Sequence, residues 1–149
     1  MMLLDHIDIQ ILQILTENSR IQWKEIGEQI HMTGQAVGNR IKKLEDNGVI
    51  KAYTIIVDEM KLGLNYTGFV IITMKSANHA SFIHLLNNRN EVVEAHRISG
   101  EGCYHLTIKV ASQEQLNQVL NQLLDHGNYS LNLSVQKIKQ CSALDATFE

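Results

Sequence analysis

The sequence predicts an α+β fold, in which a helical amino-terminal domain precedes a domain of alternating strands and helices. Up to Asn47, apolar side chains recur at the three- and four-residue intervals of amphipathic helices. After Gly48, short β-rich runs alternate with helical segments. A chain of 149 residues is long enough for one ordinary domain or two small ones. We therefore expect domains at 1–50 and 66–139, a linking strand and turn at 51–65, and a tail at 140–149.

The amino-terminal pattern predicts helices over residues 5–16, 23–30 and 34–47. Asp5 begins the first helix, where negative charge suits the positive end of the helix dipole. Thr33 can accept a hydrogen bond from the amides that open the third helix, and Gly48 can adopt the left-handed conformation that closes it. The residues at helical intervals in the second and third helices are Ile26, Ile30, Val37, Ile41 and Leu44.

Two glycines interrupt these helical patterns. Gly27 is expected to let another helix cross closely. Gly38 costs about 1 kcal/mol relative to alanine in a helix interior. That cost indicates a close approach of the backbone either to DNA or to a packed neighbour, and the sequence leaves both alternatives open.

Cationic side chains gather on the third helix. Arg40, Lys42 and Lys43 lie between its predicted caps, and no acidic residue occurs from Thr33 through Lys43. A capped cationic helix held by an apolar partner helix has the form of a helix-turn-helix motif that binds the DNA major groove. Because the formal net charge of the chain is -3, one copy should bind DNA weakly and several copies together more tightly.

The residues after Gly48 predict a connection between two domains. The run VIKAYTIIVD at residues 49–58 is typical of a strand, and residues 61–65 predict a turn around Gly63.

The carboxyl-terminal pattern predicts the order β-α-β-β-α-β, the ferredoxin-like arrangement. Ser112 and Gln115 have the spacing of a capping box, and Gly127 is expected to end the helix that this box begins. Ser99 to Gly102 predict a tight turn between the two middle strands. The expected strands are 66–74, 92–98, 103–110 and 129–139, and the expected helices are 78–88 and the segment from 112 to Gly127.

The first of these strands contains a near-continuous apolar run, Phe69–Ile72, which predicts burial on both of its faces. Helices cover only one face of a ferredoxin-like sheet. We therefore expect a second copy of the chain to cover the other face.

Other classes of protein are disfavoured. No apolar run approaches the roughly 20 residues that cross a bilayer, and the first residues lack a signal-peptide pattern, so we expect a cytoplasmic protein without membrane contact. Cys103 and Cys141 form no CxxC pair. His96, Cys103 and His105 match no standard zinc spacing and are expected to be ordinary polar residues. Neither a catalytic constellation nor a phosphate loop occurs, so we expect neither an enzyme nor a cofactor.

An ordered set of residues carries a resemblance to a known family as far as about residue 139. These residues are Leu4, Asp5, Asp8, Ile11, Leu12, Leu15, Asn18, Arg20, Glu25, Ile26, Gly27, Met32, Thr33, Val37, Arg40, Ile41, Leu44, Glu45, Gly48, Val49, Ile50, Tyr53, Leu62, Gly63 and Gly100. In this order and spacing, the chain resembles the leucine-responsive regulatory protein family, also called Lrp/AsnC or feast/famine regulators.

The resemblance implies a transcription regulator of amino-acid metabolism that assembles as dimers, and often as tetramers or octamers. It also implies an amino-acid effector bound near the loop after the second strand of the carboxyl-terminal domain. By position, the effector-binding residues here are Ser99, Gly100, Glu101, Gly102 and Cys103. The family commonly has aspartate where this chain has Cys103, so a carboxylate for the amino group of an effector is missing there. The chain also has Gln22 and Asn90 where the family commonly has a Ser or Thr helix cap and a proline.

Residues at the start and on the exposed side of the third helix are the candidate DNA contacts. Glutamine and asparagine can pair with adenine, and arginine with guanine. Lysines here are expected to contact phosphates. Arg40 could instead pair with Glu45 or another acid and stabilise the domain. The candidate residues are Thr33, Gly34, Gln35, Ala36, Asn39, Arg40, Lys42 and Lys43.

The functional hypothesis is a sequence-specific regulator that binds double-stranded DNA and is controlled by an amino acid or related metabolite. An alternative is an architectural protein that wraps or bends DNA with little effector response, which the change at Cys103 favours. Gly100 and Gly102 suit both a tight turn and the exposure of amides to an effector carboxylate.

Overall fold

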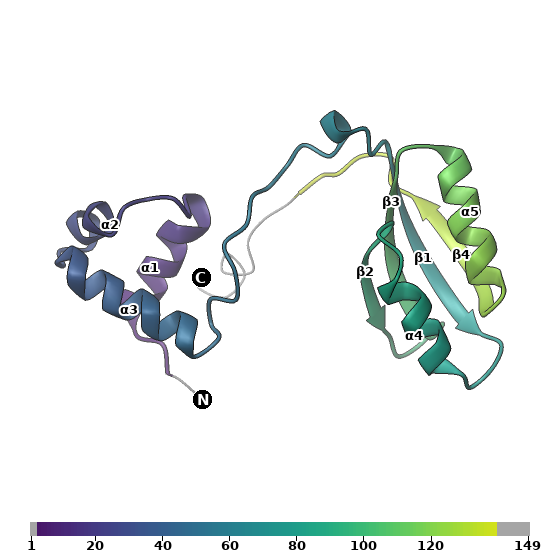
Figure 1. The fold of residues 1–149 in the computed structure, drawn as a ribbon, viewed down its shortest axis with the longest axis horizontal. Helices are drawn as coiled ribbons and strands as arrows, with labels where there is room; N and C mark the ends of the chain where they lie inside the picture. The colour runs from purple at the N-terminus through teal and green to yellow at the C-terminus, as the bar shows by residue number, and fades with distance from the viewer. Residues whose placement is uncertain (1–2, 140–149) are drawn as a thin grey trace. The chain divides into compact units, whose positions relative to one another are not determined.

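The computed structural model describes residues 3–139, so the tail predicted at 140–149 lies outside the described residues. The chain divides into two compact units, one extending to Ile56 and the other spanning Val57–Ile138 (Figure 1). Within residues 3–139, no helix combines the length and the apolar character needed to cross a membrane.

The amino-terminal unit consists of helices around a small apolar core. α1 (His6–Glu17), α2 (Trp23–Ile30) and α3 (Gly34–Asp46) agree with the predicted helices to within a residue at each end. Burial of their apolar stripes fixes which side of α3 remains in solvent. The buried core residues are Ile11, Leu12, Ile26, Ile30, Val37, Ile41 and Leu44.

Side-chain caps determine where α1 and α3 begin. Asp5 precedes α1 as its N-cap, and Asp5 and Asp8 each accept a hydrogen bond from the other's backbone amide. Thr33 caps α3 as predicted, since its Oγ1 accepts a hydrogen bond from the amide of Ala36 at 3.2 Å. After α3, Gly48 has a φ of 69°, the left-handed conformation predicted for this position.

Close packing explains both helical glycines. A Cβ on Gly27 would lie 2.3 Å from the carbonyl oxygen of Met32. The same Cβ would lie 3.3 Å from the amide nitrogen of Gly34, the first residue of α3, so Gly27 admits both the turn and the predicted close approach of another helix. A Cβ on Gly38 would lie 2.5 Å from Cε3 of Trp23, so Gly38 is needed for packing against that side chain.

The prediction of a linking strand at residues 49–58 was wrong, because no strand forms there. Residues 51–57 are extended, but they have no strand partner within residues 3–139. The Tyr53 hydroxyl donates a hydrogen bond to Oε1 of Glu45 at 2.7 Å, which attaches this segment to α3. Partial burial and the Glu45 carboxylate raise the pKa of Tyr53 to about 12. A short helix, η1 (Met60–Leu62), follows, and Gly63 makes the predicted turn with a φ of 82°.

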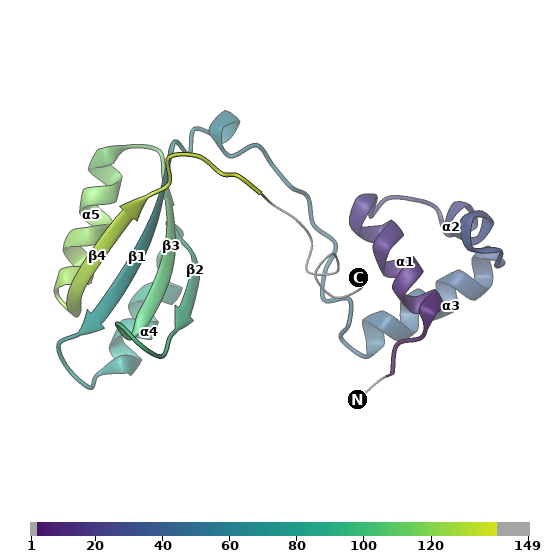
Figure 2. The same ribbon diagram turned by 180° about the vertical axis from the view of Figure 1, so that it is seen from behind.

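The second unit has the predicted ferredoxin-like order, which confirms the fold class. Within residues 3–139, its antiparallel sheet has four strands in the order β2-β3-β1-β4. Helices α4 and α5 lie on one face of this sheet (Figures 1 and 2). The elements are β1 (Tyr66–Met74), α4 (His79–Asn87), β2 (Val92–Arg97), β3 (Tyr104–Val110), α5 (Gln113–Leu124) and β4 (Gly127–Leu133).

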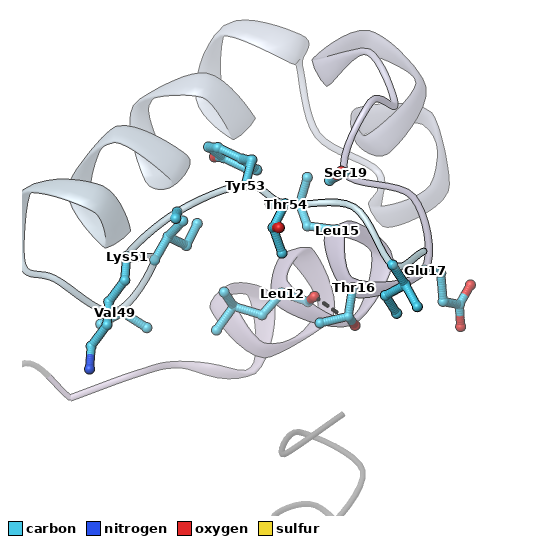
Figure 3. A pocket seen from close by; sticks show the side chains of 12 residues that line it. Leu12, Leu15, Thr16, Glu17, Ser19, Val49, Lys51, Tyr53 and Thr54 are labelled. Carbon is cyan, nitrogen blue, oxygen red and sulfur yellow. Dashed lines mark hydrogen bonds between the residues drawn. The ribbon is translucent and has the colours of Figure 1, made fainter. Parts of the chain in front are cut away.

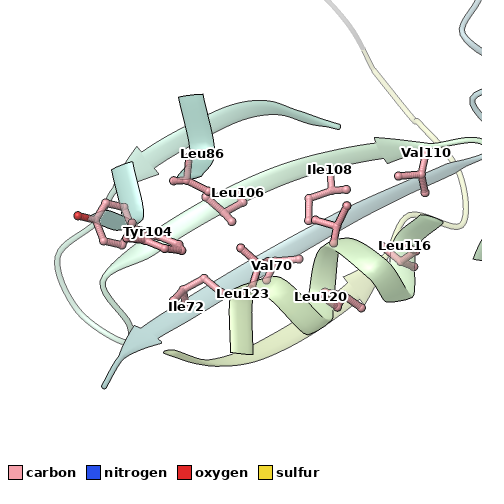
Figure 4. Packing of buried hydrophobic residues seen from close by; sticks show 12 residues of the cluster. Val70, Ile72, Leu86, Tyr104, Leu106, Ile108, Val110, Leu116, Leu120 and Leu123 are labelled. Carbon is pink, nitrogen blue, oxygen red and sulfur yellow. The ribbon is translucent and has the colours of Figure 1, made fainter. Parts of the chain in front are cut away.

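The core of this unit lies between the sheet and the two helices (Figure 4). On β1, Val70 and Ile72 are fully buried, whereas Phe69 is 38% exposed and Ile71 is half-buried. One face of this strand is therefore uncovered in the single chain, and its burial against a second copy stays a prediction. We call the face that the helices leave uncovered the open sheet face, with Phe69 and Ile71 at its centre.

The last two elements differ from prediction at their ends. α5 ends at Leu124, and Gly127 begins β4, which ends at Leu133 and not at residue 139. A Cβ on Gly127 would lie 2.6 Å from the carbonyl oxygen of Thr73, so this glycine is required by strand pairing. Only half of the predicted capping box forms. Ser112 accepts from the amide of Gln115, whose side chain accepts from the amide of Ala111.

Candidate DNA-binding surface and effector site

The exposed side of α3 carries polar and cationic side chains opposite its buried stripe. Val37, Ile41 and Leu44 are buried, whereas Asn39, Lys42 and Lys43 are exposed on the opposite side of the helix. The candidate residues that lie within α3 and are exposed are Gln35, Asn39, Lys42 and Lys43. We call these four residues the α3 polar stripe. Its amides can form paired hydrogen bonds, and its ammonium groups can neutralise phosphates.

The amino end of α3 is more enclosed than the polar stripe. Gly34 and Ala36 are half-buried, and Thr33 is exposed. A Cβ on Gly34 would lie 3.1 Å from the backbone of Lys24, so the first turns of α2 and α3 are in close contact. The turn between the helices is also tight, because His31 adopts a left-handed φ of 58°.

Arg40 lies on the other side of α3 and is held by two carboxylates of the α1 capping box. Its Nη1 donates to Oδ2 of Asp5 and to Oδ1 of Asp8, both at 2.7 Å. Asp8 is only 4% exposed, so its charge needs this partner. The alternative that Arg40 pairs with an acid therefore holds, with Asp5 and Asp8 in place of Glu45.

The pKa values of this cluster follow from the same contacts. Hydrogen bonds first to Asp5 and then to Asp8 raise the pKa of Arg40 above its usual value. The backbone amide of Asp8, followed by the Arg40 guanidinium, lowers the pKa of Asp5. Both shifts favour the ionised forms of Asp5 and Arg40 at neutral pH.

Lys42 and Lys43 are the cations that α3 leaves available to an anionic partner. Within residues 3–139, neither ammonium group has a hydrogen bond or an ion pair, and both side chains are exposed. Of the three cationic residues of α3, Arg40 is therefore neutralised by Asp5 and Asp8, and only Lys42 and Lys43 present charge to solvent.

The loop that follows β2 has an unusual backbone. Gly100 and Gly102 have φ values of 104° and 90°. A Cβ on Gly102 would lie 2.4 Å from Cγ2 of Ile71, so Gly102 packs directly on β1. The amide of Cys103 donates to the carbonyl of Ile72 at 2.6 Å, and the Cys103 carbonyl accepts from Ile98 at 3.0 Å. These contacts close the hairpin, while Ser99, Gly100 and Glu101 remain exposed.

A cavity of about 270 Å³ adjoins this loop on the open sheet face. Glu101 and Gly102 from the loop line it together with residues of β1 and β4. Those strand residues are Ile71, Thr73, Asn128, Tyr129 and Ser130. The lining combines one carboxylate, hydroxyl and amide groups, and an apolar side chain, which suits a small polar ligand with an apolar part.

A larger cavity of about 700 Å³ lies in the amino-terminal unit, between α1 and the extended segment after α3 (Figure 3). Leu12 and Leu15 line it from α1, and Val49 and Tyr53 line it from the extended segment. None of its lining residues belongs to the candidate DNA-binding or effector-binding sets.

The histidines near the loop have local partners. Nε2 of His96 lies 2.9 Å from Oε1 of Glu94, and His105 stacks on Phe69 with ring centroids 6.2 Å apart. The hydrogen bond from His96 is the main cause that lowers the pKa of Glu94. Within residues 3–139, no three His, Cys, Asp or Glu side chains form a group that could hold a metal ion.

Comparison with known families matches both units. Residues 4–45 match the AsnC-type helix-turn-helix domain, and residues 67–144 match the Lrp/AsnC ligand-binding domain. These two matches span most of the chain and agree with the folds of the two units.

The chain belongs to the Lrp/AsnC family.

Similar proteins support this assignment. The HTH-type transcriptional regulator LrpB of Bacillus subtilis is 58% identical over 139 residues, which cover 93% of each chain. The structure of LrpC from Bacillus subtilis is 31% identical with a TM-score of 0.89, covering 94% of this chain and 100% of that one. A transcriptional regulator of Neisseria meningitidis, solved in complex with L-Met, is 25% identical with a TM-score of 0.88, covering 95% and 96%. The present Lrp/AsnC chain is accordingly a helix-turn-helix transcription regulator with a ligand-binding domain.

The structure adds residues that the sequence analysis did not include in the candidate DNA-binding set. Asp5 and Asp8 determine the orientation of Arg40, and Trp23 packs against α3 at Gly38. The glycine inside a helical pattern was the one sequence signal of the Trp23 contact, but it did not identify the partner. The family motif contained Asp5, Asp8 and Arg40 without indicating that they meet.

Proposed function

We propose that α3 of this Lrp/AsnC chain lies in the major groove of duplex DNA and recognises a specific sequence there. The observation that carries the proposal is the division of α3 into a buried apolar stripe and the α3 polar stripe. Gln35 and Asn39 are one helical turn apart, and each amide can form two hydrogen bonds with an adenine edge. Lys42 and Lys43 then contact phosphates, which fixes position without specifying sequence.

The amino end of α3 supplies a phosphate contact in this proposal. Thr33 caps the amide of Ala36, and the amides of Gly34 and Gln35 have no partner among residues 3–139. Free amides and the positive end of the helix dipole favour an anion. We therefore assign a DNA phosphate to the free amides of Gly34 and Gln35, beside the exposed cap residue Thr33.

Arg40, which the sequence made a candidate for guanine recognition, has a different role in the proposal. Turning its guanidinium into the groove would leave the buried Asp8 carboxylate without its cation, at a considerable cost in free energy. Arg40 therefore acts as a positioning residue that fixes α3 against the first turn of α1.

Selection of bound fragments from genomic DNA tests the proposal and yields a duplex for quantitative measurements. Gln35→Ala and Asn39→Ala should each reduce the preference for that duplex over unrelated DNA by about tenfold. Lys42→Ala should weaken binding to both duplexes alike. It should also reduce the slope of the logarithm of the binding constant against the logarithm of salt concentration by about the amount expected for one phosphate contact. Failure of the unsubstituted chain to retain any duplex at low salt would contradict the proposed function.

We also propose that an amino acid binds at the loop of residues 99–103. The exposed Glu101 carboxylate lines the adjacent cavity and can take an ammonium group, in place of the aspartate that Cys103 replaces. The amides of residues 99–102 have no backbone partner within the described chain and can take a carboxylate. The L-Met complex of the Neisseria meningitidis regulator supports an amino acid as the ligand class.

Thermal unfolding with each of the twenty amino acids tests this effector site. One or a few should raise the midpoint, and Glu101→Gln should remove that rise while leaving the unliganded midpoint unchanged. The control Glu114→Gln alters an exposed carboxylate at the start of α5 and should retain the response. A flat response to every amino acid would favour the alternative, an architectural DNA-binding protein with little effector response.

We propose further that the chain self-associates as a dimer through the open sheet face, and that dimers assemble into a tetramer or octamer. Phe69 and Ile71 give this face an apolar centre, while polar side chains of β3 and β4 flank it. A net charge of -3 makes several copies of the α3 polar stripe necessary for tight DNA binding.

A further inference from the structure

Trp23 is the single tryptophan of the chain, and it is exposed although it is the largest apolar side chain in its unit. It is the first residue of α2, and 54% of its surface is exposed. Its indole N–H has no hydrogen-bond partner within residues 3–139. Tryptophan with one packed side and one open side is typical of a contact surface.

The packed side of the ring lies against the middle of α3. A Cβ on Gly38 would lie 2.5 Å from Cε3 and 2.6 Å from Cζ3 of Trp23. Gly38 costs about 1 kcal/mol in a helix interior, and no larger residue would leave room for the ring. The contact therefore holds the indole at a defined position on α3.

That position is at the border of the α3 polar stripe. Gly38 follows Gln35 by three residues and precedes Lys42 by four, so the three positions are neighbours on the helix surface. Arg40 lies on the opposite flank of α3, where it contacts α1. Trp23 thus occupies the α2 side of the stripe, and Arg40 occupies the α1 side.

We propose that Trp23 contacts the DNA backbone at the edge of the groove that α3 occupies. In a helix-turn-helix motif, the second helix enters the groove while the first crosses the sugar–phosphate backbone. The indole N–H can donate to a phosphate oxygen, and the exposed ring can pack on a deoxyribose. This inference rests on the proposed function of α3.

The surroundings of Trp23 favour a nucleic-acid backbone over an apolar protein partner. Lys24 follows Trp23 and lies 4.0 Å from a carboxylate oxygen of Glu28, and Lys42 follows Gly38 by one helical turn, so each of the two helices that hold the ring carries a nearby cation. The amides of Trp23 and Lys24 open α2 and have no partner among residues 3–139. Donors and positive charge around one aromatic ring match alternating phosphates and sugars.

Tryptophan fluorescence tests the inference, because all the indole emission of this chain comes from Trp23. A fluorescein-labelled duplex recovered by genomic selection is titrated while its anisotropy reports binding, and an unlabelled copy is titrated while indole emission is recorded. Emission should change in intensity and saturate at the same protein-to-DNA ratio as the anisotropy. An emission spectrum that stays unchanged while the anisotropy saturates would overturn the inference alone.

Substitutions separate contact with DNA from a purely structural role. Trp23→Phe keeps a ring over Gly38 but lacks the N–H, and should weaken DNA binding by about tenfold, as expected for a lost hydrogen bond to a charged group. Because tryptophan carries no charge, the salt dependence should stay unchanged, whereas Lys42→Ala should reduce it. Met60→Ala, which removes an exposed apolar side chain of the second unit, should leave affinity unchanged.

Near-ultraviolet circular dichroism and thermal unfolding confirm that Trp23→Phe is folded before its affinity is compared. A folded Trp23→Phe variant with the affinity of the unsubstituted chain would overturn the contact. If the unsubstituted chain retains no duplex at all, the proposed function and this inference fail together.

Discussion

Arg40 connects the helix proposed to enter DNA with the first turn of α1. It does so through Asp5 and Asp8, which are 35 and 32 residues away in the sequence. The same two carboxylates cap α1, so one cluster both begins a helix and orients its neighbour. Loss of this cluster would disturb α3 without removing any group from the α3 polar stripe.

Substitution of Arg40 should therefore reduce stability. Arg40→Met leaves the nearly buried Asp8 carboxylate without its cation, so the free energy of unfolding should fall by about 2 kcal/mol. Urea unfolding measures this change. Lys42→Met makes the same change at an exposed position of the same helix and should stay within about 0.5 kcal/mol. Equal losses in the two variants would contradict the positioning role.

Asp5 should make the stability of the chain depend on pH in acid. Its pKa is lowered from an ordinary value of 3.8, so its charge stabilises the fold above that value and the contribution is lost as pH falls through the folded-state pKa. Asp5→Asn keeps a capping side chain but cannot ionise. The variant should have a lower free energy of unfolding than the unsubstituted chain at pH 7. This difference in free energy should become smaller below about pH 4. Urea unfolding at pH 7 and below about pH 4 measures the difference in free energy of unfolding between the two chains. The same difference at both pH values would contradict the assignment.

At the scale of single elements, the hairpin between β2 and β3 depends on two glycines with different requirements. Both have positive φ, but a Cβ on Gly100 would meet nothing within 4 Å, whereas one on Gly102 would meet Ile71 at 2.4 Å. The loop can therefore tolerate a side chain at its tip but not at its base. This arrangement keeps the tip exposed next to the cavity.

The two alanine variants should differ accordingly. Gly100→Ala carries only the strain of positive φ and should lower the free energy of unfolding by about 1 kcal/mol. Gly102→Ala adds a clash with β1 and should cost at least about 1 kcal/mol more. Chemical unfolding of the full chain compares them directly. A Gly100→Ala variant as unstable as Gly102→Ala would show that the loop tip is packed.

At the scale of the whole molecule, we expect DNA affinity to depend on how many copies of α3 act together. The open sheet face should hold the copies together, since Phe69 is 38% exposed there in the single chain. Burying this apolar centre against a second copy would remove it from water, which is the dominant favourable contribution to association.

A charge on that face should separate the copies. Phe69→Asp should lower the mass found by sedimentation at micromolar concentration and weaken DNA binding by about a hundredfold through lost multivalency. Ile83→Asp places the same charge on α4, at a side chain that is 43% exposed, and should change neither. A stable monomer of the unsubstituted chain, or an unchanged mass for Phe69→Asp, would exclude this interface.

Much of the fold could be predicted because its signals are local. The helices of the first unit and the sequential order of strands and helices in the second followed from apolar periodicity, and the cap at Thr33 followed from its own side chain. The predicted strand over 49–58 failed because a strand needs a partner, and β-propensity alone supplies none. The predicted ends of β4 were wrong for a related reason, because pairing with β1 determines where this strand begins and ends.

Four features could be predicted from the amino-acid sequence alone: the helix-turn-helix unit, the ferredoxin-like unit, the family and the helix that carries the candidate DNA contacts. Each of these depends on residues close together in the chain or on an ordered motif. Three further facts required the folded structure: Arg40 is held by Asp5 and Asp8, Trp23 packs on Gly38, and one face of β1 is open. Those facts depend on which side of each element packs against a distant neighbour, because burial and ion pairing are set by distances in space and not by spacing in sequence.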